Sequence, residues 1–176
     1  MLSDDKVILR PITIEDVNDE YLSWLNNPDI SFGLAKRKYS LVDLKNYVQQ
    51  KINDDNCKFF AIIDRHSNLH IGNIKLDNYD PECKIMDLGI LIGDKNFWGK
   101  SYGRSACTLM IDYGFNVLGL RKIWLAVYEN NPAAKKLYEN LGFKLEGKLR
   151  KHICINGTYF DKYLMGLFKE EWNQKK

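Results

Sequence analysis

The segment Trp98-Gly-Lys-Ser-Tyr-Gly-Arg104 contains residues whose types and spacing could bind a phosphate group. Small residues between a strand and a helix let several backbone N–H groups face one point, where the helix dipole favours an anion. Lys100 and Arg104 would add positive charge beside it. A nucleotide-triphosphate loop would need glycine at position 94, which is Asp94 here. The segment therefore favours another phosphate-bearing ligand, although glycines at a helix start can also be purely structural.

Three more segments stand in order around this loop. They are Leu88–Gly93 before it, then Asn131–Phe143 and Glu146-Gly147 after it. Together these motifs resemble the GNAT superfamily of acyl-CoA-dependent N-acetyltransferases, and they look closest to its ribosomal-protein, polyamine and amino-sugar branch. The resemblance covers nearly the whole chain and is strongest from Asp87 to Phe168. Its most specific part is the pattern Asn-x-x-Ala-x-x-Leu-Tyr-x-x-x-Gly-Phe within the second of these segments.

The resemblance implies an α/β (α+β) fold, with residues 1–176 forming a single GNAT-like N-acetyltransferase domain. Its mixed central sheet, flanked by helices, would contain a parallel strand pair, residues 86–92 and 122–128, that splays apart at one end. Acetyl-CoA would lie in this gap, with its pantetheine amides bonded to the open strand edge and its diphosphate on the loop N–H groups. The cofactor-binding residues are then expected to be Leu91, Ile92, Trp98, Gly99, Lys100, Ser101, Tyr102, Gly103, Arg104, Asn131 and Ala134.

Two loop positions depart from the family pattern Gln/Arg-x-x-Gly-x-Gly/Ala, because Trp98 stands first and Ser101 stands fourth. We expect Ser101 to reach the same backbone conformation with a negative φ, and its hydroxyl to cap the helix or bond a phosphate oxygen. Asn131 either bonds the cofactor or the loop that holds it, or simply caps the helix that begins at Pro132.

Acetyl transfer to an amine needs two proton transfers: the ammonium must lose its proton before it attacks, and the CoA thiolate must be protonated as it leaves. By the resemblance, Tyr138 is the acid, and a reference pKa of about 10 keeps it protonated at neutral pH. Asp87 is the candidate base, directly or through water, because some relatives carry a catalytic Glu there. A backbone N–H of Leu88–Ile92 would hold the thioester oxygen. Spacing alone also fits Tyr138 as a core residue and Asp87 as the ion-pair partner of a Lys or Arg.

The acceptor is expected to enter opposite the cofactor, past the first two helices and the hairpin at Asn156-Gly157. We expect its site to be lined by Trp24, Asn26, Asn27, Phe32, Arg37, His152, Tyr159 and Asp161. Aromatic, amide and charged groups favour an amino-sugar nucleotide, whose phosphate Arg37 would meet, and they also fit a peptide N-terminus. A polyamine would need a more acidic site than Asp77, Asp80 and Glu82, which are expected to be solvated loop charges. A non-catalytic acyl-CoA-binding sensor module is the alternative from another class.

Composition argues against several other classes of protein. The 176 residues are 45% hydrophobic and 28% charged, as in a globular chain. A net charge of +3 argues against nucleic-acid binding, and no apolar run is long enough to span a membrane. The first residues lack a secretory signal, so we expect a cytoplasmic enzyme of small-molecule amines, with a homodimer as its expected assembly.

The four cysteines, Cys57, Cys83, Cys107 and Cys154, lack metal-ligand spacing, so we expect reduced, mostly buried thiols and no metal.

Hydrophobic periodicity and turn signals predict the elements that must position these residues. Strands are expected at 7–12, 58–64, 69–76, 86–92, 122–128, 144–155 and 158–168. Helices are expected at 17–26 after a cap at Thr13–Asp16, at 41–52 after a Ser40/Asp43 capping box, from 102 to near Gly119, and at 132–141 before Gly142. Asn68 and Asn156-Gly157 are expected to form hairpin turns, and residues 173–176 are expected to fray.

Overall fold

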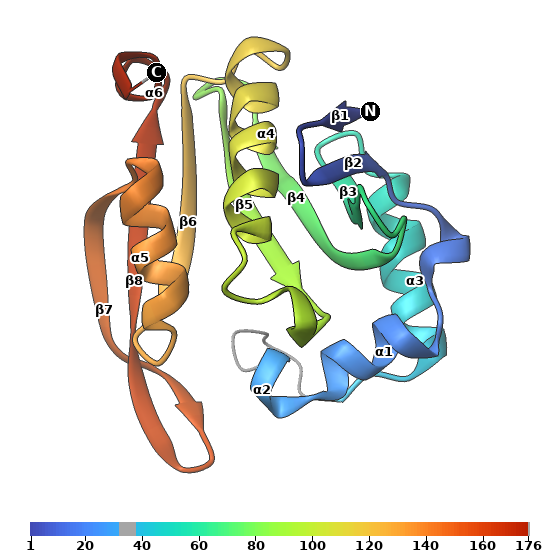
Figure 1. Cartoon of the computed structure of the whole chain (residues 1–176). Coiled ribbons are helices and arrows are strands. Elements are labelled where there is room, and N and C mark those ends of the chain that lie inside the picture. Colours follow the sequence, from blue (N-terminus) through green and yellow to red (C-terminus); the bar gives the residue numbers. More distant parts are fainter. Residues whose placement is uncertain (32–37, 176) are drawn as a thin grey trace.

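The computed structural model describes residues 1–31 and 38–175, which fold around a mixed eight-stranded sheet (Figure 1). The elements in chain order are β1 (Leu2–Ser3), β2 (Val7–Pro11), η1 (Ile14–Asp16), α1 (Asp19–Asn26), α2 (Pro28–Ser31), α3 (Leu41–Ile52), β3 (Lys58–Asp64), β4 (His70–Asp80), β5 (Ile85–Ile92), η2 (Lys95–Phe97), α4 (Tyr102–Asn116), β6 (Lys122–Tyr128), α5 (Pro132–Leu141), β7 (Lys144–Ile155), β8 (Thr158–Phe168) and α6 (Lys169–Lys175). The strand order is β1-β2-β3-β4-β5-β6-β8-β7, and β5 with β6 is the parallel pair. The expected α/β fold is confirmed.

The strands β5 and β6 pair only at one end. Their parallel register runs from Ile85 opposite Lys122 to Asp87 opposite Trp124, and stops there. Beyond that point β5 continues its antiparallel pairing with β4, while β6 continues with β8. The two strands visibly diverge toward the end of the sheet where α2 lies (Figure 1). The expected splayed pair is therefore confirmed, and the facing strand edges beyond Asp87 have no inter-strand partner.

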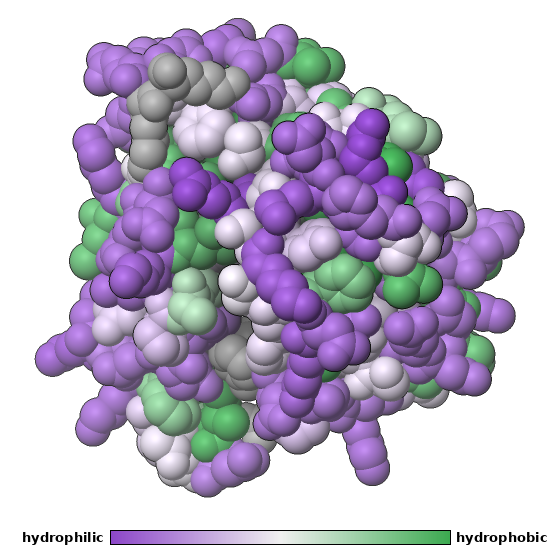
Figure 2. Space-filling view, in the orientation of Figure 1, coloured by the Kyte–Doolittle hydropathy of each residue, from purple (hydrophilic) through white to green (hydrophobic). Residues whose placement is uncertain are grey.

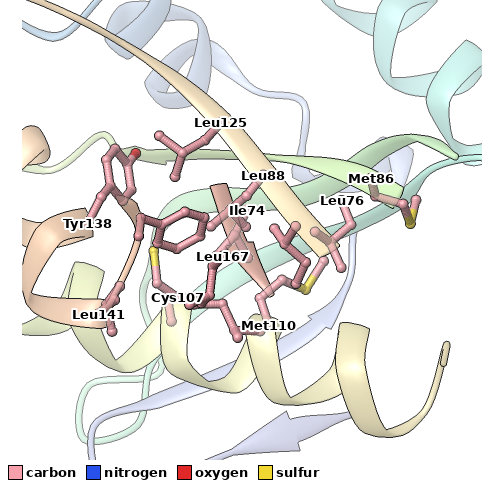
Figure 3. Packing of buried hydrophobic residues seen from close by; sticks show 14 of the residues in the cluster. Ile74, Leu76, Met86, Leu88, Cys107, Met110, Leu125, Tyr138, Leu141 and Leu167 are labelled. Atoms are coloured by element: carbon pink, nitrogen blue, oxygen red, sulfur yellow. The ribbon is translucent and has the colours of Figure 1, made fainter. Parts of the chain in front are cut away.

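Helices cover both faces of the sheet. α4 packs on β2, β4 and β5, and α5 packs on β6, on the face that Figure 1 turns to the reader. α1 and α3 cover the opposite face around a second apolar cluster that contains Trp24 and Leu44. Cys107 and Met110 of α4 and Leu88 of β5 belong to the larger apolar cluster, part of which Figure 3 shows. The sheet thus separates two apolar layers.

Local hydrogen bonds explain where several helices begin. Ser40 and Asp43 form the expected capping box of α3. The Thr13 and Asp16 side chains instead close only the short helix η1, after which Val17 is extended. α1 therefore begins at Asp19, where the side chain of Asn18 accepts from the Tyr21 N–H, and the expected start at position 17 is wrong.

The structure confirms the predicted hairpin turns but not the predicted frayed C-terminal end. Asn68 has a φ of 58°, and Asn156 and Gly157 have φ values of 50° and 81°, which confirms both hairpin turns. The expected frayed end is wrong for residues 173–175, which belong to α6. That helix is anchored by buried Trp172, whose Nε1 donates to Asp112 Oδ1 at 2.7 Å. The elements β1, α2 and α6 were not expected.

None of the four cysteines forms a disulfide. Cys57 and Cys107 are buried, whereas Cys83 and Cys154 are exposed, so the expectation of mostly buried thiols holds for half of them. Among residues 1–31 and 38–175, no group of His, Cys, Asp or Glu side chains is arranged to hold a metal ion. The helices of that same part are too short or too polar to cross a membrane. Figure 2 shows hydrophilic side chains over most of the α4 and α5 face, with hydrophobic residues in small separate patches.

Candidate functional site

A pocket of about 280 Å³ lies at the gap between β5 and β6. Residues Leu88–Leu91 of β5 and Ala126–Tyr128 of β6 form its sides. On the α5 side it is lined by Asn131, Ala134 and Tyr138, and on the α1 and α3 side by Tyr21, Leu25, Ile30, Tyr39, Tyr47, Phe59, Asn73 and Lys75. One cavity therefore connects the two faces of the sheet through the splay, and a ligand in it can meet the unpaired edge of β5.

The loop before α4 presents unused backbone donors. Gly99 and Ser101 have φ values of 70° and 69°, and α4 begins at Tyr102. The first backbone bond of this turn is donated by the Ser105 N–H to the Ser101 carbonyl at 3.0 Å. Within the described residues, the N–H groups of 99–104 have no acceptor. Such a set of N–H groups at a helix N-terminus suits a phosphate group, and phosphate binding by this loop stays a prediction.

The expectation for the Ser101 backbone is wrong. Its φ is positive, in the left-handed region that favours glycine, and its hydroxyl makes no cap hydrogen bond. The reason is the turn that begins at Gly99, which redirects the chain from the end of β5 into α4. A positive φ places some strain on the backbone of a serine, whereas glycine would adopt the same loop conformation freely.

Side chains around the loop hold it in place. Trp98 Nε1 donates to the Ile92 carbonyl at 2.8 Å, which ties the loop to the end of β5. The Tyr102 hydroxyl donates to Asp64 Oδ1 at 2.9 Å, and its ring packs edge-on against Phe97. The side chains of Trp98 and Tyr102 thus position the loop, whereas the exposed Lys100 and Arg104 extend from it. The predicted cofactor residues Leu91, Asn131 and Ala134 line the pocket itself.

Tyr138 is both a core residue and a pocket residue. Only 6% of it is exposed, and its ring packs against Phe143. Figure 3 shows its hydroxyl pointing away from Cys107 and Leu141. Among the described residues the hydroxyl has no hydrogen-bond partner, yet the side chain lines the pocket. Burial, with a smaller effect of Cys107, raises the pKa of Tyr138 well above its ordinary value, so this group stays protonated and able to donate.

Asp87 lies at the closed end of the gap and does not line the pocket. Its Oδ1 accepts from Asn78 Nδ2 at 2.6 Å, and no lysine or arginine of the described chain forms an ion pair with it. Burial raises the pKa of Asp87, and the nearby charge of Asp77 adds to the rise. A carboxylate with a raised pKa suits a general base, but its position requires an intervening water.

Asn131 is a helix cap that also borders the pocket, so its expected bond to the cofactor stays a prediction. Its Oδ1 accepts from the Ala134 N–H at 3.1 Å, which makes it the N-cap of α5. It also lines the pocket. A cap residue fixed in this way presents the remainder of its amide to a ligand without a change of conformation.

Among the described residues, none of those expected to bind the acceptor lines the pocket. Trp24 is 5% exposed and packs on His70, and a Cβ at Gly93 would lie only 1.9 Å from its ring, so Trp24 is a core residue. Asn26 is bonded to the backbone of Tyr39, and Asn27 accepts from the Asp29 N–H at the end of α1. These polar side chains shape the chain around the pocket rather than facing into it.

The three expected residues on the β7–β8 hairpin also lie away from the pocket. His152 and Tyr159 are exposed, and Asp161 is bonded to Lys148 Nζ at 2.5 Å and to the Lys151 N–H at 2.8 Å. None of the three lines the pocket. The remaining two candidates, Phe32 and Arg37, lie outside the described residues.

Sequence reasoning missed the aromatic and polar residues that line the pocket on the α1 and α3 side. They are Tyr21, Tyr39, Tyr47, Phe59, Asn73 and Lys75. A partial signal existed: Tyr47 lies three residues after Leu44 on the α3 face that packs on the sheet, and Asn73, Lys75 and Asp77 alternate along β4. This alternation predicts that the three polar side chains share one face of the strand. It does not predict that this face borders a pocket.

Asp77 belongs to a buried charge network, so the expectation of a solvated loop charge is wrong for it. It lies in β4 and is 2% exposed. Lys51 Nζ donates to its Oδ1 at 2.8 Å, and Lys75 Nζ donates to its Oδ2 at 2.5 Å. Burial by itself raises the pKa of Asp77, but these two lysines outweigh it and lower the pKa to about 2. The pair of lysines thereby holds the carboxylate ionised inside the protein.

Asp77 should make the fold sensitive to acid. Because its pKa falls from 3.8 to about 2 on folding, the ionised carboxylate stabilises the native state above pH 4, and that stability is lost as the pH falls through 2. The shift corresponds to about 2 kcal/mol. Asp77→Asn should therefore be less stable by about that amount at pH 7 and should lose less stability between pH 4 and pH 2. Urea unfolding at several pH values measures both effects, with Glu82→Gln, an exposed carboxylate, as the control; equal acid sensitivity in all three proteins would contradict the assignment.

A model of the acetyltransferase (GNAT) domain family matches residues 6–144. An uncharacterised N-acetyltransferase, p20, of Bacillus licheniformis is 29% identical over 175 residues, covering 97% of each chain. The spermidine N(1)-acetyltransferase of Vibrio cholerae is 31% identical over 148 residues, covering 84% of each chain.

Solved structures that are similar to this chain include proteins of the same kind as these relatives. The spermidine N-acetyltransferase of Vibrio cholerae, solved in complex with CoA and spermine, superposes with a TM-score of 0.88 at 27% identity and covers 97% of this chain and 99% of its own. A spermidine N-acetyltransferase of the same organism was also solved as a dodecamer, with a TM-score of 0.83 at 26% identity, over 98% of this chain and 99% of its own.

Proposed function

Since this chain belongs to the GNAT family and is an acetyl-CoA-dependent N-acetyltransferase, we propose that its acceptor is the primary amine of a small molecule, with polyamines as the favoured class. Its relatives include spermidine acetyltransferases over nearly the whole chain, and a structural relative was solved with spermine. These relatives favour the polyamine alternative over the amino-sugar nucleotide that the sequence led us to expect.

The observation that carries the proposal is the pocket through the β5–β6 gap. The free edge of Leu88–Leu91 offers backbone groups to pantetheine amides, and the unused N–H groups of 99–104 lie beyond the end of β5, where a diphosphate would sit. The residues present therefore fit acetyl-CoA. The acceptor is left with the half of the pocket on the α1 and α3 side.

The side chains around the gap suit a direct transfer. The acceptor nitrogen forms a bond to the thioester carbon, the carbon–sulfur bond breaks, and the sulfur takes the electron pair together with a proton from Tyr138. A backbone N–H of β5 stabilises the charge on the carbonyl oxygen. Asp87 accepts the proton of the amine through water, in line with its raised pKa. None of the described residues that line the pocket is a cysteine, so they support direct attack rather than an acetylated enzyme.

The acceptor half of the pocket has aromatic walls. Tyr21, Tyr39, Tyr47 and Phe59 surround it, and aromatic faces attract both methylene groups and ammonium groups. A polyamine chain offers both. This half of the pocket therefore supports a slender amine, with recognition through ring faces rather than through carboxylates.

The acceptor class can be tested with purified protein, acetyl-CoA and a panel of amines. Spermidine, spermine, glucosamine, an amino-sugar nucleotide and a peptide with a free N-terminus should be compared by release of free thiol and by product mass. We expect spermidine or spermine to give the highest kcat/KM. A higher kcat/KM for an amino sugar or the peptide would overturn the polyamine class, and CoA binding without any acceptor-dependent thiol release would favour the acyl-CoA sensor module instead.

Several expectations about the setting of the enzyme stay predictions. They are a single domain over residues 1–176, a homodimer, a cytoplasmic location, and the absence of nucleic-acid and membrane partners. Size-exclusion chromatography with light scattering would measure the assembly state. A dodecamer, as solved for a relative from Vibrio cholerae, would replace the dimer.

A further inference from the structure

Lys75 is the one lysine or arginine among the described residues that line the pocket, and none of those residues is a carboxylate. It stands opposite Gly89 in the β4–β5 register. Because Gly89 has no side chain, the Lys75 stem passes over β5, with its Cε 3.5 Å from the point that a Cβ would occupy. The lysine therefore lies two residues beyond Asp87, the last β5 residue paired with β6, where the gap opens.

The Lys75 ammonium has one donor to spare. It donates to the Tyr47 hydroxyl at 3.1 Å and to Asp77 Oδ2 at 2.5 Å, and its third N–H has no acceptor within the described chain. Burial alone would lower the pKa of Lys75, but its contacts with Tyr47 and Asp77 outweigh this and raise it. The group consequently remains a cation at every pH at which the enzyme could work.

Asn73, two residues earlier on the same face of β4, supplies a second unused donor. It is 4% exposed and lines the pocket. Its Oδ1 lies 3.1 Å from His70 Nε2, which also lies 2.9 Å from the Gly72 carbonyl, so Nε2 carries the proton. The Asn73 Nδ2 has no partner in the described part of the chain. A buried donor without an acceptor is costly, and it indicates a group that a ligand can meet.

The other ionisable groups near Lys75 lie behind it or carry no charge. Asp87 on β5 is bonded to an asparagine, and Lys51 on α3 lies between Asp77 and Asp54. Burial raises the pKa of the Cys57 thiol to about 12 and lowers the pKa of His70, so both are neutral. None of these groups lines the pocket. The acceptor half therefore presents an ammonium and an amide donor.

We propose that Lys75 and Asn73 select the neutral form of the acceptor amine at the point of attack. An ammonium can only donate hydrogen bonds, so two donors offer it no partner, and the charge of Lys75 repels it. The bound amine accordingly releases its proton to solvent or to Asp87 more readily than the free amine does. This inference rests on the proposed function, and it explains how a pocket wall without carboxylates serves an enzyme of basic amines.

The test compares wild type with Lys75→Met, Lys75→Arg and Lys51→Met over the pH range. In Lys75→Met the bound spermidine should need a higher pH to lose its proton, so the midpoint of the kcat profile should rise by about one pH unit. At pH 7 both kcat and KM should fall about tenfold, because protonated spermidine then binds unproductively, while kcat/KM should change little. With 2,2,2-trifluoroethylamine, which is largely neutral at pH 7, kcat should change less than about twofold.

Lys51→Met is the matched control, because Lys51 is bonded to the same carboxylate but does not line the pocket. Both methionine variants should lose comparable thermal stability, and only Lys75→Met should shift the kcat profile. Lys75→Arg should keep the wild-type midpoint. An equal loss of kcat with both amines, the same shift in Lys51→Met, or no shift in Lys75→Met would overturn the inference. Wild type that acetylates no amine would instead overturn the proposed function.

Discussion

Replacing Tyr138 by phenylalanine should lower kcat by at least about a hundredfold while leaving the fold intact. The sulfur leaving the thioester then lacks its proton donor, and general acid catalysis is worth about 10² to 10⁴ in rate. The hydroxyl has no hydrogen-bond partner among the described residues, so its removal should change the free energy of unfolding by only about 0.5 kcal/mol. Steady-state kinetics and urea unfolding measure the two quantities separately.

Tyr163→Phe is the matched control for this experiment. Tyr163 also packs against the main core cluster but does not line the pocket, so its variant should keep the wild-type kcat. The dissociation constant of acetyl-CoA should stay within about twofold in both variants. Undiminished kcat in Tyr138→Phe would refute the acid assignment, and Asp87→Asn tests the base in the same way through the acidic limb of the kcat profile.

Placing a negative charge in the loop before α4 should specifically weaken acetyl-CoA binding. In Ser101→Asp, a carboxylate would compete with the diphosphate for the unused N–H groups of 99–104 and would repel it. We expect the KM for acetyl-CoA to rise about tenfold to a hundredfold. Isothermal titration with CoA and steady-state kinetics at low salt would measure the effect, which should shrink as salt is added.

Two further variants at position 101 separate charge from backbone conformation. Ser101→Asn has nearly the size of the aspartate and tolerates a positive φ, so it should bind CoA almost as wild type does. Ser101→Gly should relieve the left-handed strain and stabilise the fold by about 1 kcal/mol without loss of affinity. Equal KM values for the aspartate and asparagine variants would show that the diphosphate binds elsewhere.

Local signals in the sequence were sufficient for several elements. The Ser40/Asp43 box begins α3, and Gly142 ends α5 with a positive φ. Such features depend on hydrogen bonds and backbone preferences within a few residues, so no distant contact can easily override them. Where two local caps competed, as at Thr13 and Asn18, the chain used both in succession, and the start of α1 moved by two residues.

The loop at residues 98–104 was predictable in kind but not in conformation. Its glycines indicate N–H groups gathered at a helix start, and the structure shows those groups without acceptors. The positive φ of Ser101 was not predicted, because a serine gives no local signal for the left-handed region that glycine adopts freely. The hydrogen bond from Trp98 Nε1 to the Ile92 carbonyl was not predicted either, because neither residue type signals it.

Periodicity and turn signals in the sequence predicted most strands and helices, whereas the class of fold, the splayed strand pair and the place of Tyr138 were predicted from motifs that resemble a known family. Only the tertiary structure decided which side chains line the pocket on the α1 and α3 side. Lys75 lies there because Gly89 on the next strand leaves room for its stem, while Trp24 is withdrawn into the core by its packing on His70. Packing between segments that are distant in the chain decides which side chains face a cavity. Local patterns in a single sequence do not show which segments pack together.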